Sequence, residues 1–173
     1  KECGFGCVVC GSAVYTYEHI RPTWVNAREH SPVAMALLCG RCQDKSTRRL
    51  LSKETILAAR RNPICLRTRS AHDRLDIGPC GITVRLGGAK FVHPKTVLRV
   101  CGRDLLTIRE PEEPGTPFRV SGEFFDRAGK LCLAIDDNEL KVASDNWDAE
   151  VVGSRLIVRR APGDIVLRLI AAG

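Results

Sequence analysis

Two CxxC pairs supply the residues of this chain whose types and spacing are best suited to chemistry. They are Cys7–Cys10 and Cys39–Cys42, and residues 11–38 separate them. Two such pairs predict a tetrahedral site in which four thiolates bind Zn²⁺ and leave no position open. A closed site of this kind is structural, and its metal contributes folding free energy on the order of 10 kcal/mol. Gly11 follows the first pair and Gly40 lies inside the second, where we expect tight turns.

The remaining cysteines do not extend this pattern. The chain has nine cysteines, and an odd number argues against a closed disulfide framework. Cys3 is an alternative ligand to Cys7, although its CxxxC spacing suits a metal knuckle less well. The others are spaced singly, and we expect them to be small buried apolar residues: Cys65, Cys80, Cys101 and Cys132. Free thiols and a thiolate metal site both predict a reducing, cytoplasmic location.

Positive charge is concentrated in one stretch. The chain has 27 Lys and Arg against 20 Asp and Glu, and residues 41–75 hold ten of these bases but only three of the acids. That stretch therefore carries the whole net charge of +7. Such a density predicts contacts with phosphate groups, with a merely solvated helix face as the alternative. The cations expected at this surface are Arg41, Lys45, Arg48, Arg49, Arg60 and Arg61.

The preferred acidic partner is double-stranded DNA held by its backbone. Aromatic residues make up only 5% of the chain, which disfavours stacking on single-stranded bases. Backbone contacts carry little sequence information, so we expect little sequence preference.

Helices and short strands must position these groups. We expect helices over about Cys42–Leu51 and over Lys53–Arg61, with Ser52 as the N-cap of the second. Short strands are expected near Cys7–Cys10 and around Ala13–Tyr17. Trp24, Tyr15 and Tyr17 are expected in the core, whereas His72 and His93 are expected at the surface.

From Ile82 onward the hydrophobic pattern changes to period two, with turn signals between the segments. Many short strands of this kind predict an all-β domain, either a sandwich or a short stacked solenoid. The class is therefore α+β: a zinc module (residues 1–63), a linker (64–80) and an all-β domain (81–173). No apolar run approaches about 18 residues, which excludes a transmembrane helix on sequence grounds. The start of the chain has no signal-peptide pattern. It also lacks Met, so an original N-terminus is expected to precede Lys1.

The text around the two pairs resembles the HNH (ββα-metal) endonuclease family. The matching residues are Cys7–Cys10, then Glu18-His19-Ile20-Arg21-Pro22, then Leu38–Cys42, and finally Lys45-Ser46-Thr47. The resemblance covers about residues 3–63. Residues 76–173 look like the β-rich tail of some bacterial HNH-like proteins, notably over Gly129–Leu140 and Trp147–Arg159.

The resemblance implies a ββα-metal fold that hydrolyses DNA phosphodiester bonds with Mg²⁺ or Mn²⁺. In that scheme His19 is the general base and Glu18 binds the cation. Two positions depart from the family pattern, because Ala34 stands in place of the orienting Asn and Gln43 in place of the final His. Asp44 is a substitute for the final His and Asn26 for the orienting Asn, and His30 is a further candidate for the site.

Three functions follow from these patterns. The first is a metal-dependent DNA endonuclease, with His19, Glu18 and Gln43 in the catalytic site. The second is a catalytically degenerate HNH-like module that binds nucleic acid without cutting. The third is a protein-interaction module built on the β domain, in which the zinc module only provides support.

Overall fold

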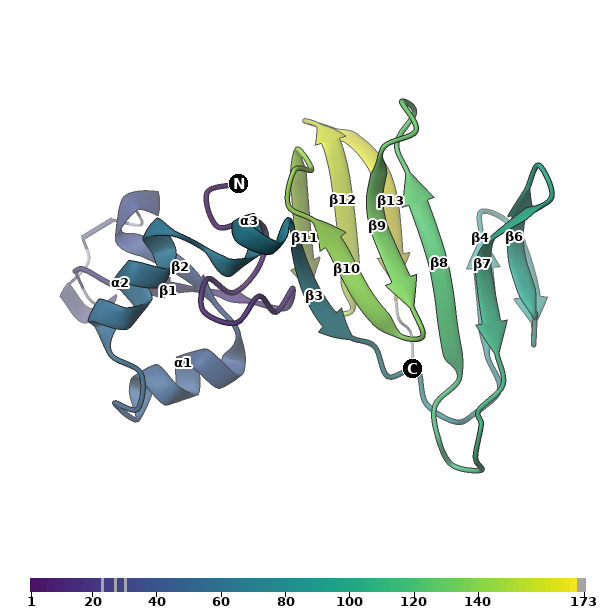
Figure 1. Cartoon of the computed structure of the whole chain (residues 1–173), viewed down its shortest axis with the longest axis horizontal. Coiled ribbons are helices and arrows are strands. Elements are labelled where there is room, and N and C mark those ends of the chain that lie inside the picture. Colours follow the sequence, from purple (N-terminus) through teal and green to yellow (C-terminus); the bar gives the residue numbers. More distant parts are fainter. Residues whose placement is uncertain (23, 27, 30, 171–173) are drawn as a thin grey trace. The chain divides into compact units, whose positions relative to one another are not determined.

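The computed structural model describes residues 1–22, 24–26, 28–29 and 31–170 of an α+β chain (Figure 1). The chain divides into two compact units, each taken here by itself. The first unit joins Lys1–Asp73 to Lys141–Gly173, and the second is Arg74–Leu140. Residues 64–80, expected as a linker, include a helix and a strand of regular structure.

The first unit begins with a hairpin and three helices, drawn in purple to blue in Figure 1. Strands β1 (Thr16–His19) and β2 (Met35–Leu38) pair antiparallel, with Thr16 opposite Leu38. Two short 3₁₀ turns, η1 (Trp24–Asn26) and η2 (Pro32–Ala34), lie between these strands. The helices follow in order: α1 (Gly40–Thr47), α2 (Lys53–Arg61) and α3 (Ile64–Thr68).

Local sequence explains where the helices start. The Ser52 side chain accepts a hydrogen bond from the Thr55 N–H, so the predicted N-cap of α2 is confirmed, and so are the predicted bounds of this helix. Helix α1 begins earlier and ends earlier than predicted, because Cys39 caps it and Arg49 adopts a left-handed backbone (φ 62°). The strands predicted near residues 7–17 reduce to β1, since Cys7–Cys10 forms a turn.

A small core holds these elements together. Ile56 of α2 is fully buried and packs with Val8, Ile20 and Leu38 around the cysteines of the two pairs. Burying a large aliphatic side chain of this kind contributes about 1.5–3 kcal/mol. The cysteine site is therefore part of the hydrophobic core of these elements.

The rest of the first unit is β-rich. Strands β3 (Ser70–Arg74) and β10 (Glu139–Ala143) are followed by β11 (Asp148–Val152), β12 (Arg155–Ala161) and β13 (Asp164–Ile170). The last three form an antiparallel sheet in the order β11-β12-β13. Val158 at its centre is fully buried. This sheet joins the N-terminal residues in one unit, an association that the sequence analysis did not predict.

The second unit consists of antiparallel strands. A hairpin pairs β4 (Thr83–Leu86) with β5 (Ala89–Val92). A meander then runs through β6 (Thr96–Val100), β7 (Arg103–Arg109), β8 (Arg119–Phe125) and β9 (Leu131–Asp136). Each strand of the meander pairs antiparallel with the next, which confirms that the region after Ile82 is rich in β-strands.

The longest helix of the described part of the chain, α2, has nine residues, and no helix there is long and apolar enough to span a bilayer.

Candidate metal centre and basic surface

Four cysteines from two distant segments meet in the first unit. The Sγ atoms of Cys7, Cys10, Cys39 and Cys42 all lie within 4.8 Å of one another. The Sγ atoms of Cys10 and Cys39 are 3.5 Å apart. A tetrahedral zinc site with Zn–S bonds of about 2.3 Å needs sulfur–sulfur distances near 3.8 Å. The cluster is therefore consistent with a structural Zn²⁺ site.

The backbone around the cluster fits two metal knuckles. The Gly11 N–H donates to the Cys7 carbonyl at 2.8 Å, and Gly11 has φ +85°, as expected for a tight turn. An added Cβ at Gly11 would lie 2.9 Å from Cε1 of His72. The second knuckle is different, because Gly40 is the first residue of α1 and has open space around it. The expected tight turn at Gly40 is therefore wrong, since Cys39 and Cys42 are brought together by the first turn of a helix.

Burial and hydrogen bonds shift the pKa values of these thiols in different directions. The Cys42 N–H donates to Cys39 Sγ at 3.4 Å. Burial raises the pKa of the Cys10 thiol, but hydrogen bonds from the Ser12 backbone and the neighbouring thiols outweigh it and lower the pKa overall. Burial raises the pKa of both Cys7 and Cys42. Buried thiols of this type need a cation such as Zn²⁺ to hold them as thiolates.

Two further cysteines lie close to this site without belonging to the four-sulfur group. Cys3 is buried in the same core, but its sulfur is not a member of the cluster. Cys65 is fully buried, and burial raises the pKa of its thiol to about 12. The expectation of burial holds for Cys65 and Cys132, whereas Cys80 and Cys101 are exposed.

Glu18 and Gln43, two residues of the predicted catalytic set, meet beside the cluster. The Gln43 side-chain amide donates to Glu18 Oε2 at 3.2 Å, and its oxygen accepts from the Thr16 hydroxyl at 3.1 Å. The other oxygen of Glu18 lies 2.6 Å from Lys53 Nζ in a partly buried ion pair. Lys53 Nζ also donates to the His19 carbonyl at 3.3 Å. Both carboxylate oxygens of Glu18 are therefore already bonded to side chains of the protein.

His19 ends strand β1 and is only 4% exposed. Strand alternation does not explain this burial, because Tyr17 lies on the same face of β1 and is 67% exposed. Ala34 lies in η2, and its carbonyl accepts from the Ile20 N–H at 2.8 Å. Of the substitutes considered, Asp44 pairs with Arg48, Asn26 is exposed in η1, and His30 lies outside the described residues.

The aromatic and histidine predictions have mixed outcomes. Tyr15 is partly buried and its hydroxyl donates to the Ala149 carbonyl at 3.2 Å, whereas Tyr17 is 67% exposed, so the core expectation for Tyr17 is wrong. Its position explains this, because β1 is one strand of a two-stranded hairpin. His72 and His93 are exposed, as predicted. The side chain of Trp24 lies outside the described residues.

Most cations of the basic stretch are exposed. Within the described part of the chain, six of them have no carboxylate oxygen within 4.0 Å: Arg41, Lys45, Arg49, Arg61, Arg67 and Arg69. The acids nearest to them in sequence are already engaged, since Asp44 pairs with Arg48 and Glu54 pairs with Arg21. The excess positive charge of this stretch is therefore uncompensated locally.

Arg60 differs from the other cations of the stretch, because its side chain is only 19% exposed. Its guanidinium donates to the carbonyls of Met35 at 2.6 Å and Pro32 at 3.0 Å, and to Glu2 at 3.1 Å. These bonds join the end of α2 to the start of β2. Arg60 thus stabilises the fold around the second cysteine pair, and its Nε and Nη2 groups already have acceptors.

Sequence reasoning missed Lys53 as a residue of this site, and it missed the structural role of Arg60, which was expected only as a cation of the basic surface. Lys53 and Arg60 bond to groups that lie 35 and 25 residues away in the chain, at Glu18 and Met35. Their spacing carries no signal of these partners. A helical projection of α2 offers one clue, because Lys53 and Arg60 lie seven residues apart and so share a face with the buried Ile56.

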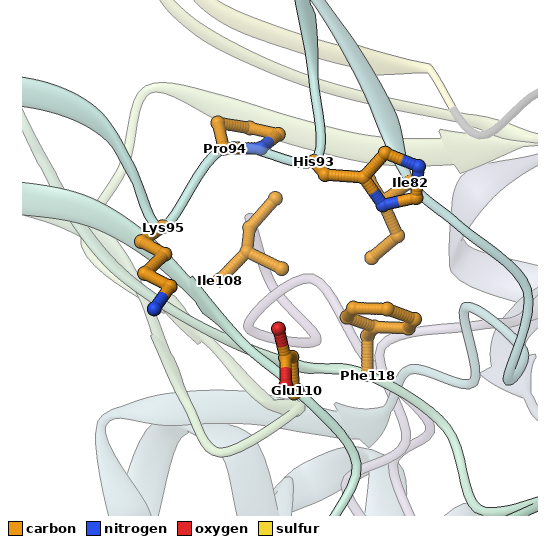
Figure 2. A pocket seen from close by; sticks show the side chains of 7 residues that line it. All are labelled: Ile82, His93, Pro94, Lys95, Ile108, Glu110 and Phe118. Atoms are coloured by element: carbon orange, nitrogen blue, oxygen red, sulfur yellow. The ribbon is translucent and has the colours of Figure 1, made fainter.

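The second unit offers a small hollow and several ion pairs. The hollow has a cavity volume of about 30 Å³, and in Figure 2 Ile82, Ile108 and Phe118 surround it, with Lys95 and His93 on opposite sides. That volume suits one or two water molecules, so it is too small for an organic ligand. Elsewhere in this unit, Arg99 pairs with Asp104, and Arg119 pairs with both Glu112 and Asp137. Neither feature is a candidate active site.

Comparisons of the chain with models of protein families, with curated proteins and with solved structures gave no match.

Proposed function

We propose that the zinc module binds double-stranded nucleic acid, DNA foremost, by its phosphate backbone and without cutting it. The observation that carries this proposal is the row of exposed cations without carboxylate partners in the described residues 41–69. Phosphate oxygens are the acceptors that such arginines suit best, because a guanidinium offers them paired donors.

Helix α1 sets the spacing of two cations of this surface. Arg41 and Lys45 are four residues apart and so lie on one face of the helix, about 6 Å apart along its axis. Arg49 is the second residue after the end of the helix and is also exposed. Cations at this spacing suit successive groups along a phosphate backbone.

The cysteine cluster supports the surface. Cys39 is the N-cap of α1 and Cys42 lies in its first turn. A metal bound to both would therefore fix the start of the helix that carries Arg41 and Lys45. Zn²⁺ in this role is structural, because all four positions would be filled by protein. Loss of the metal would then loosen the basic surface as well as the core.

Charge-removing variants test the proposal against a matched control. We would measure binding of the full chain to a fluorescein-labelled 20-bp duplex by anisotropy. Lys45→Gln/Arg49→Gln removes two exposed cations of the zinc module, and we expect affinity to fall roughly tenfold or more. Arg85→Gln/Lys90→Gln removes two exposed cations, opposite each other in the β4–β5 hairpin, and should leave affinity unchanged. Equal losses in both variants would mean non-specific charge attraction and would refute the assignment of the surface.

A metal-dependent endonuclease is the second candidate function. It is favoured by one observation, the contact between Glu18 and Gln43 beside the buried His19. Two observations oppose it. Lys53 already neutralises Glu18, and a general base that is 4% exposed has little access to water.

Supercoiled plasmid separates the two candidates. The full chain is incubated with plasmid and Mg²⁺ or Mn²⁺, with EDTA as the metal-free control, beside a His19→Ala variant. We expect a mobility shift without nicking. Nicking that needs both the divalent cation and His19 would replace the binding proposal with the endonuclease.

A further inference from the structure

Leu50 is an exposed apolar residue within the basic stretch of the zinc module. It follows Arg49 directly, in the connection between α1 and α2, and is 75% exposed. The next residue, Leu51, is partly buried and packs against the core around the cysteines. Leu51 thus supplies the apolar contact of this connection, and the side chain of Leu50 contributes little to the fold because it remains in water.

Hydrogen bonds at the end of α1 hold the backbone of Leu50 in one place. The Leu50 N–H donates to the Lys45 carbonyl at 2.8 Å, and the Arg49 N–H donates to the Ser46 carbonyl at 3.1 Å. Because Arg49 has a left-handed backbone (φ 62°), these two bonds form a Schellman motif. A residue in the place of Leu50 commonly packs against an apolar residue in the place of Lys45. Here Lys45 is charged and exposed, so the motif presents the leucine to solvent.

The charges next to Leu50 suit a nucleic acid better than a protein. Within the described part of the chain, Lys45 and Arg49 are exposed and have no carboxylate oxygen within 4.0 Å. Asp44, the acid of α1, is already paired with Arg48 at 2.9 Å. A protein partner would have to desolvate both cations beside its apolar contact. A duplex instead offers phosphates to the cations and base pairs to the leucine.

Proteins that bend DNA use single apolar side chains of this kind. A leucine or another apolar residue enters from the minor groove between two base pairs, partly unstacks them and kinks the duplex. We propose that Leu50 is such a wedge, inserted at a base step of the duplex whose backbone is held by Lys45 and Arg49. This inference rests on the proposed function and deepens it, because it states that the module kinks the duplex that it binds.

A wedge gives the module a preference among duplexes without any reading of base edges. Unstacking a base step costs free energy, and the cost is lowest where the stack is already weak, as at a mismatch. We therefore expect the full chain to bind a duplex with one central T·T mismatch about tenfold more tightly than the matched duplex. Leu50 carries no charge, so it should not contribute to the salt dependence of binding.

The test measures unstacking and affinity on the same 20-bp duplexes, matched and mismatched. 2-Aminopurine, a fluorescent base that brightens when it is unstacked, is placed beside the mismatch. We expect the full chain to raise its fluorescence and to prefer the mismatched duplex. Leu50→Asn keeps the size of the side chain but not its apolar character. This variant should bind the matched duplex with the parent salt slope, without the rise in fluorescence and without the preference.

Two further variants show whether the apolar side chain at this position is what matters. Leu50→Met keeps an apolar wedge, so it should retain both the rise in fluorescence and the preference for the mismatch. Leu86→Asn is the matched control, because Leu86 is 48% exposed and follows the exposed Arg85 in the β4–β5 hairpin of the second unit. It should behave as the parent chain does.

The outcomes separate this inference from the proposed function. Binding of both duplexes with equal affinity and no rise in fluorescence overturns the inference and leaves the proposed function standing, with Leu50 free for a protein partner. Absence of binding to every duplex overturns both. A parent-like response in Leu50→Asn, or a loss in Leu50→Met as complete as in Leu50→Asn, also overturns the inference. Should Leu50→Asn fail to fold, Leu50→Ala decides in the same way.

Discussion

Replacing one cysteine of the cluster with serine isolates the contribution of the metal. Cys10 is the best position, because it is the half-buried member of the four, so Cys10→Ser removes a ligand without leaving a large cavity. A complete thiolate zinc site contributes about 10–16 kcal/mol to folding. One quarter of that, about 3 kcal/mol, is a large part of the 5–15 kcal/mol that stabilises a typical domain. The variant should therefore unfold about 12–24 °C below the parent chain.

Two measurements on the same samples check this prediction. Metal analysis of the parent chain should find about one zinc ion per molecule, and Cys10→Ser should retain much less. Circular dichroism should show a lower unfolding temperature in the variant, and EDTA should lower it in the parent chain. The second unit carries none of the four ligands, so we expect its transition to be unchanged.

Cys80→Ser is the control, because Cys80 is an exposed cysteine outside the cluster. It should match the parent chain in zinc content and stability. A Cys10→Ser protein with full zinc content and the parent unfolding temperature would refute the assignment of the four thiolates.

Three smaller predictions concern local structure, and urea unfolding followed by circular dichroism measures each. Arg60→Gln should lower the free energy of unfolding by about 1–3 kcal/mol, because backbone carbonyls lose their donor. Arg61→Gln, at the exposed neighbouring position, should change it by less than about 0.5 kcal/mol. Equal effects of the two variants would contradict the role given to Arg60. Gly11→Ala should cost more than about 1 kcal/mol because the position has φ +85°, and an unchanged midpoint would show that the turn is not needed. Ser52→Ala should cost about 1 kcal/mol through loss of the cap on Thr55 N–H, and no change would mean that the cap is dispensable.

Those parts of the fold that depend on residues close together in the chain could be predicted from the sequence. The two CxxC pairs predicted the four-sulfur cluster, because ligand type and spacing are local properties. Ser52 as the N-cap predicted the start of α2, and the Asn62-Pro63 pair that follows the helix predicted its end. Alternation after Ile82 predicted β-strands, since period two is a property of each strand alone.

Long-range partners were beyond that reasoning. Nothing near Lys53 indicates that its ammonium group would pair with Glu18, which lies 35 residues away. Alternation identifies a strand but not its neighbours, so the association of residues 141–173 with the N-terminal residues was missed. Exposure of Tyr17 was missed for the same reason, because an aromatic residue on a strand gives no sign of whether a second layer covers it.

Salt dependence of duplex binding tests the central claim most directly. The association constant of the full chain for a blunt duplex is measured from 50 to 300 mM KCl. Three phosphate contacts through Arg41, Lys45 and Arg49 predict a log–log slope of about −2.7, reduced to about −0.9 in Lys45→Gln/Arg49→Gln. Arg85→Gln/Lys90→Gln should keep the parent slope. A parent slope near zero, or a slope that the first variant leaves unchanged, would contradict the claim that the zinc module binds the phosphate backbone.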